Sequence, residues 1–489
     1  MSVEYEAVIG LEVHAEMQTD SKMFCSCRVL DNTEAQPNSA VCPVCAGMPG
    51  VLPVINQKAI EYALKVALAL HCQVNRTSIF ARKNYFYPDL PKGYQISQYE
   101  EPLAENGHLV IHTSLGERRI RIRRAHMEED TGKLTHTTRD EVSYSLVNLN
   151  RAGVALLEVV SEPDMSSSEE ARAYAASLRA VLRCLGVNSG DMEKGVIRFE
   201  ANVSIRPQGS DELNTRVEIK NLNSFRALER SIDYEIKRQT QVVENGGKII
   251  QETLGWDENR NVTYSQRSKE HAHDYRYFPE PDLPPLIVEN EWVERLRASM
   301  PELPDARARR FQSQYGLSPY DADVLITEQA VADYYEAVIA SAPKASPKTI
   351  ANWITGELFA LMNRSGTNPD EMQSSAFNVP PQALAGLINL LTENEINQNT
   401  AKTVLTEMFE SGKTPGDIVI QRGLRQISDS DLIASLVKQV LDENAVPVQD
   451  YLNGKDTLLN WLFGQIMRAA KGKANPQILR AELDQQIDL

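Results

Sequence analysis

The alternation of apolar and polar side chains divides the chain into a strand-rich first part and a helical second part. Over residues 3–165 the apolar residues recur mostly at every second position, which is the spacing of half-buried strands. From residue 292 onward they recur at helical spacing, in one amphipathic stretch after another. Strands with interspersed helices, and no regular strand–helix–strand repeat, predict an α+β fold with a largely antiparallel sheet. An all-α part is expected to follow it.

Three helices are predicted in the first part, over residues 56–70, 167–185 and 223–244. Ser167 and Glu170 have the spacing of a capping box at the start of the second helix, and Gly186 follows its end. Residues 198–207 and 215–220 alternate as strands, and we expect them to pair with each other.

Two of the predicted strands carry polar side chains on one face. In residues 9–14, IGLEVH, the alternation places Glu12 and His14 on one face and their apolar neighbours on the other. In residues 119–123, RIRIR, the isoleucines are expected to point inward and the arginines toward solvent or a ligand.

Three adjacent acids, Glu128, Glu129 and Asp130, precede a turn-prone Thr-Gly pair. Such a concentration of negative charge is unfavourable unless a cation neutralises it. Mg²⁺ prefers oxygen ligands and often shares its coordination shell with phosphate oxygens. Together with Glu12 and His14, the acids therefore indicate a metal–nucleotide site. The alternative is a solvated acidic loop beside an edge-strand histidine, because runs of charge usually face water.

Four of the six cysteines form two close pairs on either side of a loop, and these are Cys25, Cys27, Cys42 and Cys45. In a reducing compartment this spacing predicts a tetrahedral zinc site. The protein fills all four ligand positions, so the zinc is expected to be structural. The alternative is four unrelated thiols. Cys72 and Cys184 lie in apolar helical stretches and are expected to be inert core thiols.

Composition narrows the class of protein. The chain has 489 residues, of which 42% are hydrophobic and 24% charged, as in a soluble globular protein with ample core. No apolar run approaches the ~20 residues of a membrane-spanning helix, and no signal peptide is visible, so we expect a cytoplasmic protein. A net charge of −16 argues against a nucleic-acid coat or a membrane-surface protein, but local basic patches remain compatible with it. No glycine-rich nucleotide loop of the Rossmann or P-loop type is present.

Residues 82–98, RKNYFYPDLPKGYQISQ, combine cations with aromatic rings. The cations Arg82, Lys83 and Lys92 suit phosphates, and the rings suit stacking of a base; the rings are those of Tyr85, Phe86, Tyr87 and Tyr94. The alternative is an aromatic core loop with incidental lysines.

Seven long words occur in a fixed order along the chain. They are residues 9–14 (IGLEVH), 82–98 (quoted above), 126–133 (HMEEDTGK), 158–164 (EVVSEPD), 218–225 (EIKNLNSF), 274–282 (DYRYFPEPD) and 464–476 (GQIMRAAKGKANP). With these words the chain resembles, from end to end, the GatB family, which comprises the B subunits of the aspartyl/glutamyl-tRNA amidotransferases.

The resemblance implies three parts. A cradle-shaped, glutamine-synthetase-like catalytic domain with the zinc insertion is expected over residues 1–291, and a helical domain over residues 292–409. A YqeY-like, α-helical tRNA-binding tail is expected over residues 410–489. Proline-rich segments at residues 279–285 and 378–381 mark seams in the chain.

The resemblance also implies a reaction. Members of the family phosphorylate the side-chain carboxylate of a misacylated Glu-tRNA(Gln) or Asp-tRNA(Asn) with ATP and Mg²⁺, and ammonia then displaces the phosphate. Phosphoryl transfer needs positioning and charge neutralisation more than covalent help. The sequence shows no glutaminase signature. The resemblance therefore assigns ammonia supply to an amidase (glutaminase) partner, the A subunit, and places a small C subunit between the two.

Residue by residue, the resemblance implies three sets of site residues. The catalytic set, of which the first four are the expected magnesium ligands, is Glu12, His14, Glu128, Glu129, Arg198 and Asn202. The nucleotide-binding set is Lys83, Tyr85, Lys92, Glu158, Glu200 and Lys220. The tRNA-binding set in the tail is Lys455, Arg468, Lys471 and Lys473, unless they form a merely solvated basic turn. Residues 198–202 read RFEAN where the family usually has RCDAN, so Glu200 keeps the charge on a longer side chain.

Two rival functions explain less of the sequence. An RNA-binding module without chemistry accounts for the cysteine loop, the aromatic loop and the helical tail, but not for the Glu and His cluster. A stand-alone ATP-dependent ligase accounts for the carboxylates but not for the tail.

Overall fold

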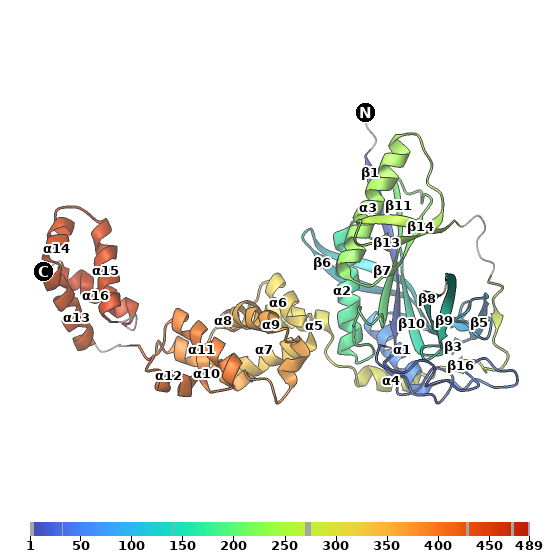
Figure 1. Cartoon of the computed structure of the whole chain (residues 1–489), viewed down its shortest axis with the longest axis horizontal. Coiled ribbons are helices and arrows are strands. Elements are labelled where there is room, and N and C mark those ends of the chain that lie inside the picture. The colour runs from blue at the N-terminus through green and yellow to red at the C-terminus, as the bar shows by residue number, and fades with distance from the viewer. Residues whose placement is uncertain are drawn as a thin grey trace. The chain divides into compact units, whose positions relative to one another are not determined.

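The chain forms two compact units, Met1–Arg307 and Ala308–Leu489. A computed structural model describes residues 4–31, 33–139, 141–268, 275–426, 430–470 and 474–487. The first unit is built around a large sheet, and the elements described in the second unit are helices (Figure 1).

A nine-stranded sheet has the order β14-β13-β12-β11-β1-β10-β7-β6-β2. Its strands are β1 (Tyr5–Glu16), β2 (Gln73–Val74), β6 (Ala104–Thr113), β7 (Gly116–Glu129), β10 (Ala155–Ser161), β11 (Ile197–Pro207), β12 (Val217–Leu222), β13 (Glu252–Asp257) and β14 (Val262–Ser268). Every neighbouring pair is antiparallel except β12–β13. The pairing predicted between residues 198–207 and 215–220 is confirmed by β11 and β12.

Three small sheets complete the first unit. β4 (Phe80–Asn84) pairs with β5 (Tyr94–Gln98) and with β15 (Phe278–Pro279). β3 (Thr77–Ser78) pairs with β16 (Leu286–Ile287). β8 (Lys133–Arg139) and β9 (Val142–Asn148) form a hairpin directly after the acidic run.

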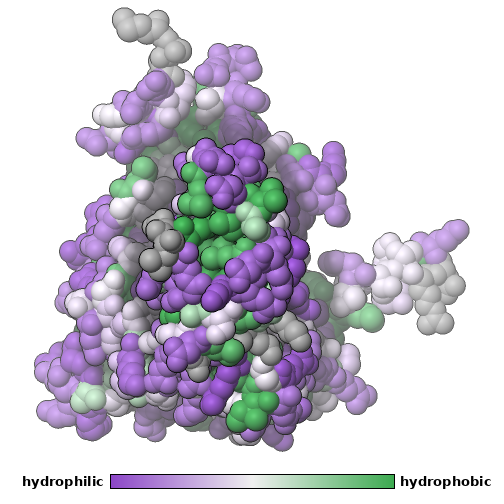
Figure 2. Space-filling view, turned by 90° about the vertical axis from the view of Figure 1, so that its left-hand side faces the viewer, coloured by the Kyte–Doolittle hydropathy of each residue, from purple (hydrophilic) through white to green (hydrophobic). Residues whose placement is uncertain are grey.

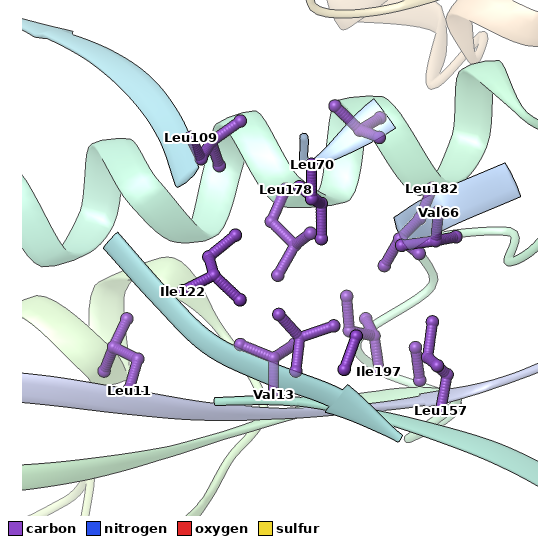
Figure 3. Close-up of a cluster of buried hydrophobic side chains, with 14 of the residues drawn as sticks. Leu11, Val13, Val66, Leu70, Leu109, Ile122, Leu157, Leu178, Leu182 and Ile197 are labelled. Atoms are coloured by element: carbon purple, nitrogen blue, oxygen red, sulfur yellow. The ribbon is translucent and has the colours of Figure 1, made fainter. Parts of the chain in front are cut away.

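Helices cover one face of the nine-stranded sheet. They are α1 (Gln57–Ala69), α2 (Ser168–Cys184) and α3 (Phe225–Glu244), and α4 (Asn290–Ala298) packs against α1. Figure 3 shows the core between them: Leu178 and Leu182 of α2 meet Val13, Leu157 and Ile197 of the sheet. In β7, Ile120 and Ile122 are buried and Arg121 and Arg123 exposed, which confirms the predicted alternation.

The three predicted helices are confirmed, with α1, α2 and α3 within two residues of the expected ends. Ser167 caps α2 by accepting a hydrogen bond from the Glu170 amide. The Glu170 carboxylate accepts from the amide of Ser166 rather than from Ser167, so the predicted capping box is only half formed.

The helices from the end of the first unit onward are α5 (Pro304–Tyr315), α6 (Pro319–Ile326), α7 (Gln329–Ser341), α8 (Pro347–Asn352), the π-helix η1 (Trp353–Leu358), α9 (Phe359–Ser365), the 3₁₀ helix η2 (Pro369–Gln373), α10 (Pro381–Thr392), α11 (Gln398–Ser411), α12 (Pro415–Gln421), α13 (Ser430–Glu443), α14 (Ala445–Leu452), α15 (Thr457–Ala469) and α16 (Pro476–Ile487). Their buried side chains form two separate clusters. One runs from Ala308 to Val419 and the other from Ile433 to Ile487.

None of the helices in the described ranges is long and apolar enough to cross a membrane. On the face that Figure 2 shows, hydrophilic side chains frame one patch of hydrophobic ones.

Candidate functional site

The candidate site lies on the sheet face opposite the helices. In β1, Leu11 and Val13 are fully buried in the core beneath the helices. Because side chains alternate along a strand, Glu12 and His14 point to the other face. Both are half-buried, as the alternation of residues 9–14 predicts.

The cross-strand register gathers charged residues around β1. His14 stands opposite Glu158 of β10 on one side and Arg198 of β11 on the other. Glu12 stands opposite Glu200 of β11. Residues directly opposite one another in an antiparallel pair project from the same face, so these side chains form one polar surface.

Two overlapping groups on this surface have the geometry of metal ligands. One comprises His14, Glu128 and Glu158, and the other Glu12, His14 and Glu200. Within each group the ligand atoms lie within 4.8 Å of one another. The His14 Nδ1 atom is 3.6 Å from Glu128 Oε1. A donor set of carboxylate oxygens with one imidazole fits a hard divalent cation such as Mg²⁺.

Together the two groups form what we call the carboxylate cluster. The electrostatics of the carboxylate cluster favour positive charge at its centre. Burial by itself lowers the pKa of His14, but Glu158, Glu128 and Glu200 outweigh it and raise that pKa to about 9. Burial opposes ionisation of Glu158 as well, yet the charges of His126 and His14 hold its pKa well below its ordinary value.

Lys83 of β4 adds a cation to the same cluster. Burial lowers its pKa, but the fields of Glu128 and Glu158 outweigh burial and raise the pKa above its ordinary value. The ammonium therefore stays charged beside the two carboxylates. Its Nζ atom also lies 5.4 Å from the centre of the Tyr275 ring.

Glu129 is not part of the cluster, although the sequence places it among the magnesium ligands. Neighbouring residues of β7 point to opposite faces, so Glu128 and Glu129 diverge. The Glu129 carboxylate accepts hydrogen bonds from the Lys92 ammonium and, at 2.9 Å, from the Ile96 amide. Lys92, expected to bind nucleotide, is thus engaged by Glu129.

Arg198 and Asp130 form a second buried charge group. The Arg198 guanidinium donates to Asp130 Oδ2 at 2.8 Å and lies 3.9 Å from Glu16. Arg151 lies 3.7 Å from the same Asp130 oxygen. Burial raises the pKa of Asp130, but the two arginines outweigh it and lower that pKa to about 2. Arg198 therefore organises carboxylates of its own chain, on the same sheet face as His14.

The remaining candidates border the cluster. Asn202 donates to Glu12 Oε1 at 3.0 Å, which orients that carboxylate. Lys220 pairs with Glu200 at 2.5 Å and with Glu218 at 3.1 Å.

A pocket of about 1130 Å³ opens beside Lys220 and Glu218. Its wall includes Tyr85, Phe86 and Tyr87 of residues 82–98, which we call the aromatic loop, and we call this cavity the aromatic pocket. The Phe86 side chain is 94% exposed and Tyr87 57%, so these two rings do not form a core loop. They are free to stack on a ligand.

Comparison with known proteins decides the family. Residues 7–294 match the GatB/GatE catalytic domain family, and residues 333–487 match the GatB domain family. The chain belongs to the GatB family. It is 52% identical to the B subunit of the aspartyl/glutamyl-tRNA(Asn/Gln) amidotransferase of Carboxydothermus hydrogenoformans, over 98% of this chain and 99% of that protein. It is also 52% identical to the Moorella thermoacetica protein of the same name, over 99% of this chain and 100% of that protein.

In this GatB chain the four paired cysteines converge. Their ligand atoms lie within 4.8 Å of one another, and Cys45 Sγ is 3.8 Å from Cys42 Sγ and 3.9 Å from Cys27 Sγ. Bonds of about 2.3 Å to a tetrahedral zinc would separate the sulfurs by about 3.8 Å. A hydrogen bond from Cys25 outweighs burial and lowers the pKa of Cys45 to about 4.

A buried lysine adjoins the cysteine cluster. Lys22 is fully buried, and its Nζ atom lies 3.5 Å from Cys45 Sγ. It also donates to the carbonyls of Ala40, at 2.8 Å, and Leu149, at 3.2 Å. Its positive charge complements a thiolate site, which is negative when zinc is bound by four deprotonated cysteines.

Half of the tail candidates fall within the described residues. Lys455 is paired with Asp450 at 2.8 Å, and Arg468 is exposed in the last turn of α15. Lys471 and Lys473 lie outside the described residues.

Sequence reasoning missed His126 and placed Glu158 in the nucleotide-binding set, whereas the structure groups Glu158 with His14 and Glu128. His126 is buried, and its Nε2 atom lies 3.4 Å from Glu158 Oε2, which holds that carboxylate toward His14. The alternation of residues 126–128 already places His126 and Glu128 on one face. The pairing of His126 with Glu158 depends on the register of β7 and β10.

Proposed function

We propose that this chain is the component of an aminoacyl-tRNA amidotransferase that activates glutamate or aspartate on a misacylated tRNA. The observation that carries the proposal is the carboxylate cluster, with His14, Glu128 and Glu158 as one of its two groups. The cluster shares one sheet face with the aromatic pocket. The names of relatives at about 52% identity support the same reaction.

The chemistry proceeds in two steps. A side-chain carboxylate oxygen of the substrate attacks the γ-phosphorus of ATP, and ADP leaves. Ammonia then attacks the acyl carbon, inorganic phosphate leaves, and the nitrogen gives up a proton. The products are Gln-tRNA(Gln) or Asn-tRNA(Asn).

Magnesium would be held by His14, Glu128 and Glu158, with Glu12 and Glu200 at the rim, and would neutralise phosphate charge. The chain itself supplies the orientation. Asn202 fixes Glu12, and His126 fixes Glu158. The exposed rings of the aromatic loop offer stacking surfaces for the terminal bases of the tRNA.

The names of the relatives, which are B subunits, support a proposal for the wider assembly. We assign ammonia supply to an amidase (glutaminase) partner, the A subunit, with the small C subunit between the two, in the cytoplasm. We further propose a glutamine-synthetase-like cradle over residues 1–291, a helical domain over residues 292–409, and a YqeY-like tail over residues 410–489 that binds tRNA. Structural zinc at the four cysteines is part of the same proposal.

Substitution of one ligand tests the site. In the reconstituted complex of the three proteins, Glu128→Gln is expected to abolish ATP-dependent transamidation of Glu-tRNA(Gln) and Asp-tRNA(Asn), because it removes a metal-binding charge. Glutamine hydrolysis by the partner should persist. The matched control is Glu410→Gln, at an exposed position on α11 in the second unit. Transamidation at the unmodified rate by the Glu128 variant, in saturating Mg²⁺, would contradict the proposal.

A further inference from the structure

The fully buried Lys22 links the two pairs of cysteines. Its backbone amide donates a hydrogen bond to the carbonyl of Cys27, in the first pair, at 2.9 Å. Its side chain extends to the second pair, where the Nζ atom lies 3.5 Å from Cys45 Sγ. One residue therefore contacts both halves of the site at which we propose zinc.

The Lys22 ammonium has three hydrogen-bond partners and only one of them can carry a negative charge. Two are the carbonyl oxygens of Ala40, at 2.8 Å, and Leu149, at 3.2 Å, and the third is Cys45 Sγ. An ammonium has three protons, so all of them are used. Within the described ranges no carboxylate forms an ion pair with Lys22. Its counter-charge can therefore come only from the sulfur.

The buried ammonium and a zinc–thiolate site each supply the charge that the other lacks. A buried ammonium without a counter-charge is strongly unfavourable. Zinc binds cysteine as the thiolate, so four thiolates around one Zn²⁺ leave a net negative charge. Groups that donate hydrogen bonds to metal ligands orient those ligands and tune the affinity for the metal.

The same region of the chain connects the cysteines to the acidic run. Leu149, whose carbonyl binds the Lys22 ammonium, directly follows β9. The amide of Met23 donates to the carbonyl of Gly153 at 2.7 Å, and the amide of Gly153 donates to the carbonyl of Asp130 at 2.9 Å. Residues 149–153 therefore bridge Lys22 and the backbone of the acidic run.

We propose that Lys22 is a positioning residue that supplies the counter-charge of the zinc–thiolate site and fastens this site to residues 149–153. Zinc and Lys22 then stabilise each other, and loss of either one loosens the segment that holds the acidic run. The inference rests on the zinc assignment within the proposed function, and is independent of the assignment of phosphoryl transfer.

Substitution of Lys22 in the full chain tests the counter-charge. Lys22→Met keeps the apolar length of the side chain and removes its charge. The affinity for zinc, measured by competition with a chelator, is expected to fall roughly 10- to 100-fold. Lys22→Gln removes the charge but keeps an amide donor, and it should also weaken zinc binding, which preserves the test if Lys22→Met does not fold. Lys58→Met, at an exposed position on α1, is the matched control.

Thermal unfolding separates the counter-charge from the two carbonyl contacts. The Tm of Lys22→Met is expected to fall in the zinc-loaded chain and to fall much less in the chain stripped of zinc. The reason is that the ammonium of the stripped, unmodified chain already lacks the zinc-bound thiolate that balances its charge. Loss of the carbonyl contacts alone would lower Tm equally in both forms.

Hydrogen exchange tests the connection to the acidic run. The amides of residues 149–153 should exchange faster in the stripped chain and in Lys22→Met than in the zinc-loaded, unmodified chain, because their anchor is weakened. The amides of α11, in the second unit, provide the internal reference.

Three results would overturn the inference. They are an unchanged zinc affinity in both Lys22 variants, an equal loss of Tm with and without zinc, and unchanged exchange of residues 149–153. An unmodified chain that binds no zinc would overturn the zinc assignment together with the inference. Zinc that binds equally well to the Lys22 variants would overturn the inference alone. None of these results concerns Glu128→Gln, which tests transamidation.

Discussion

At the scale of single residues, two neighbouring acids of one run, Glu128 and Glu129, have different partners. Glu128 faces the cluster, and Glu129, one residue further, faces Lys92. The Glu129 and Lys92 side chains are 3% and 13% exposed. A carboxylate so placed supports the aromatic loop, which contains Lys92, rather than a metal.

Glu129→Gln is therefore expected to act first on stability. The glutamine can still accept from the Ile96 amide, but the Lys92 ammonium is left buried without its counter-charge, which costs about 3–5 kcal/mol. Denaturant unfolding of the purified chain measures this loss. The double variant Glu129→Gln/Lys92→Met should recover most of it, because no unpaired charge remains. A single variant as stable as the unmodified chain would show that the pair contributes nothing.

At the scale of elements, the cysteine loop supports the aromatic loop. Gly47, two residues after the last cysteine, has a φ of +68°, and a Cβ atom there would lie 2.9 Å from the Lys92 amide nitrogen. The two loops are therefore in direct backbone contact, and any side chain at this position would push them apart. A cysteine loop with a fixed conformation therefore supports the aromatic loop, which lines the pocket.

Metal analysis of the purified chain, never exposed to chelator, should find close to one zinc per chain. Cys42→Ser should lose the zinc and lower Tm by several degrees, because binding of zinc at a four-cysteine site adds to the free energy of unfolding. Cys184→Ser, outside the cluster, is the matched control. A chain without zinc, or a Cys42 variant with unchanged Tm, would contradict the assignment of a structural metal.

At the scale of the whole molecule, the boundary of the tail follows from its packing. Ile418 and Val419 are buried in the cluster that begins at Ala308, whereas the last cluster begins at Ile433. A truncation that begins at residue 410 would therefore remove buried residues from the cluster that begins at Ala308. A truncation after Gln426 removes the last cluster as a unit and leaves the cluster that begins at Ala308 intact.

Removal of residues 427–489 is expected to weaken binding of misacylated tRNA while transamidation chemistry and partner glutaminase activity persist. The slope of log affinity against log salt should become shallower by roughly 0.7–0.9 for each phosphate that the shortened chain no longer neutralises. Arg468→Gln in the full chain should show the same change on a smaller scale, because it removes a single cation. Salt titrations of tRNA binding give both values. Identical slopes for the full and shortened chains would make the tail a structural appendage.

The sequence by itself determined the features that depend on short spacings. The alternation of residues 9–14 placed Glu12 and His14 on one face, because neighbouring residues of a strand point in opposite directions. Periodicity and capping residues located α1, α2 and α3. The spacing of the cysteines indicated their convergence, because each pair lies within four residues. The resemblance to the GatB family rested likewise on contiguous words.

Only the tertiary structure decided which residues meet across strands. Glu158 joins His14 and Glu128 through the register of β1, β10 and β7, which no local pattern encodes. Glu129 lies outside the cluster although it directly follows Glu128 in the sequence. Arg124 and Arg216 face one cavity although 92 positions separate them, since a bulge in β7 re-aims one and the sheet order brings the other near. Strand register and bulges depend on packing over the whole sheet, and that is why they had to be observed.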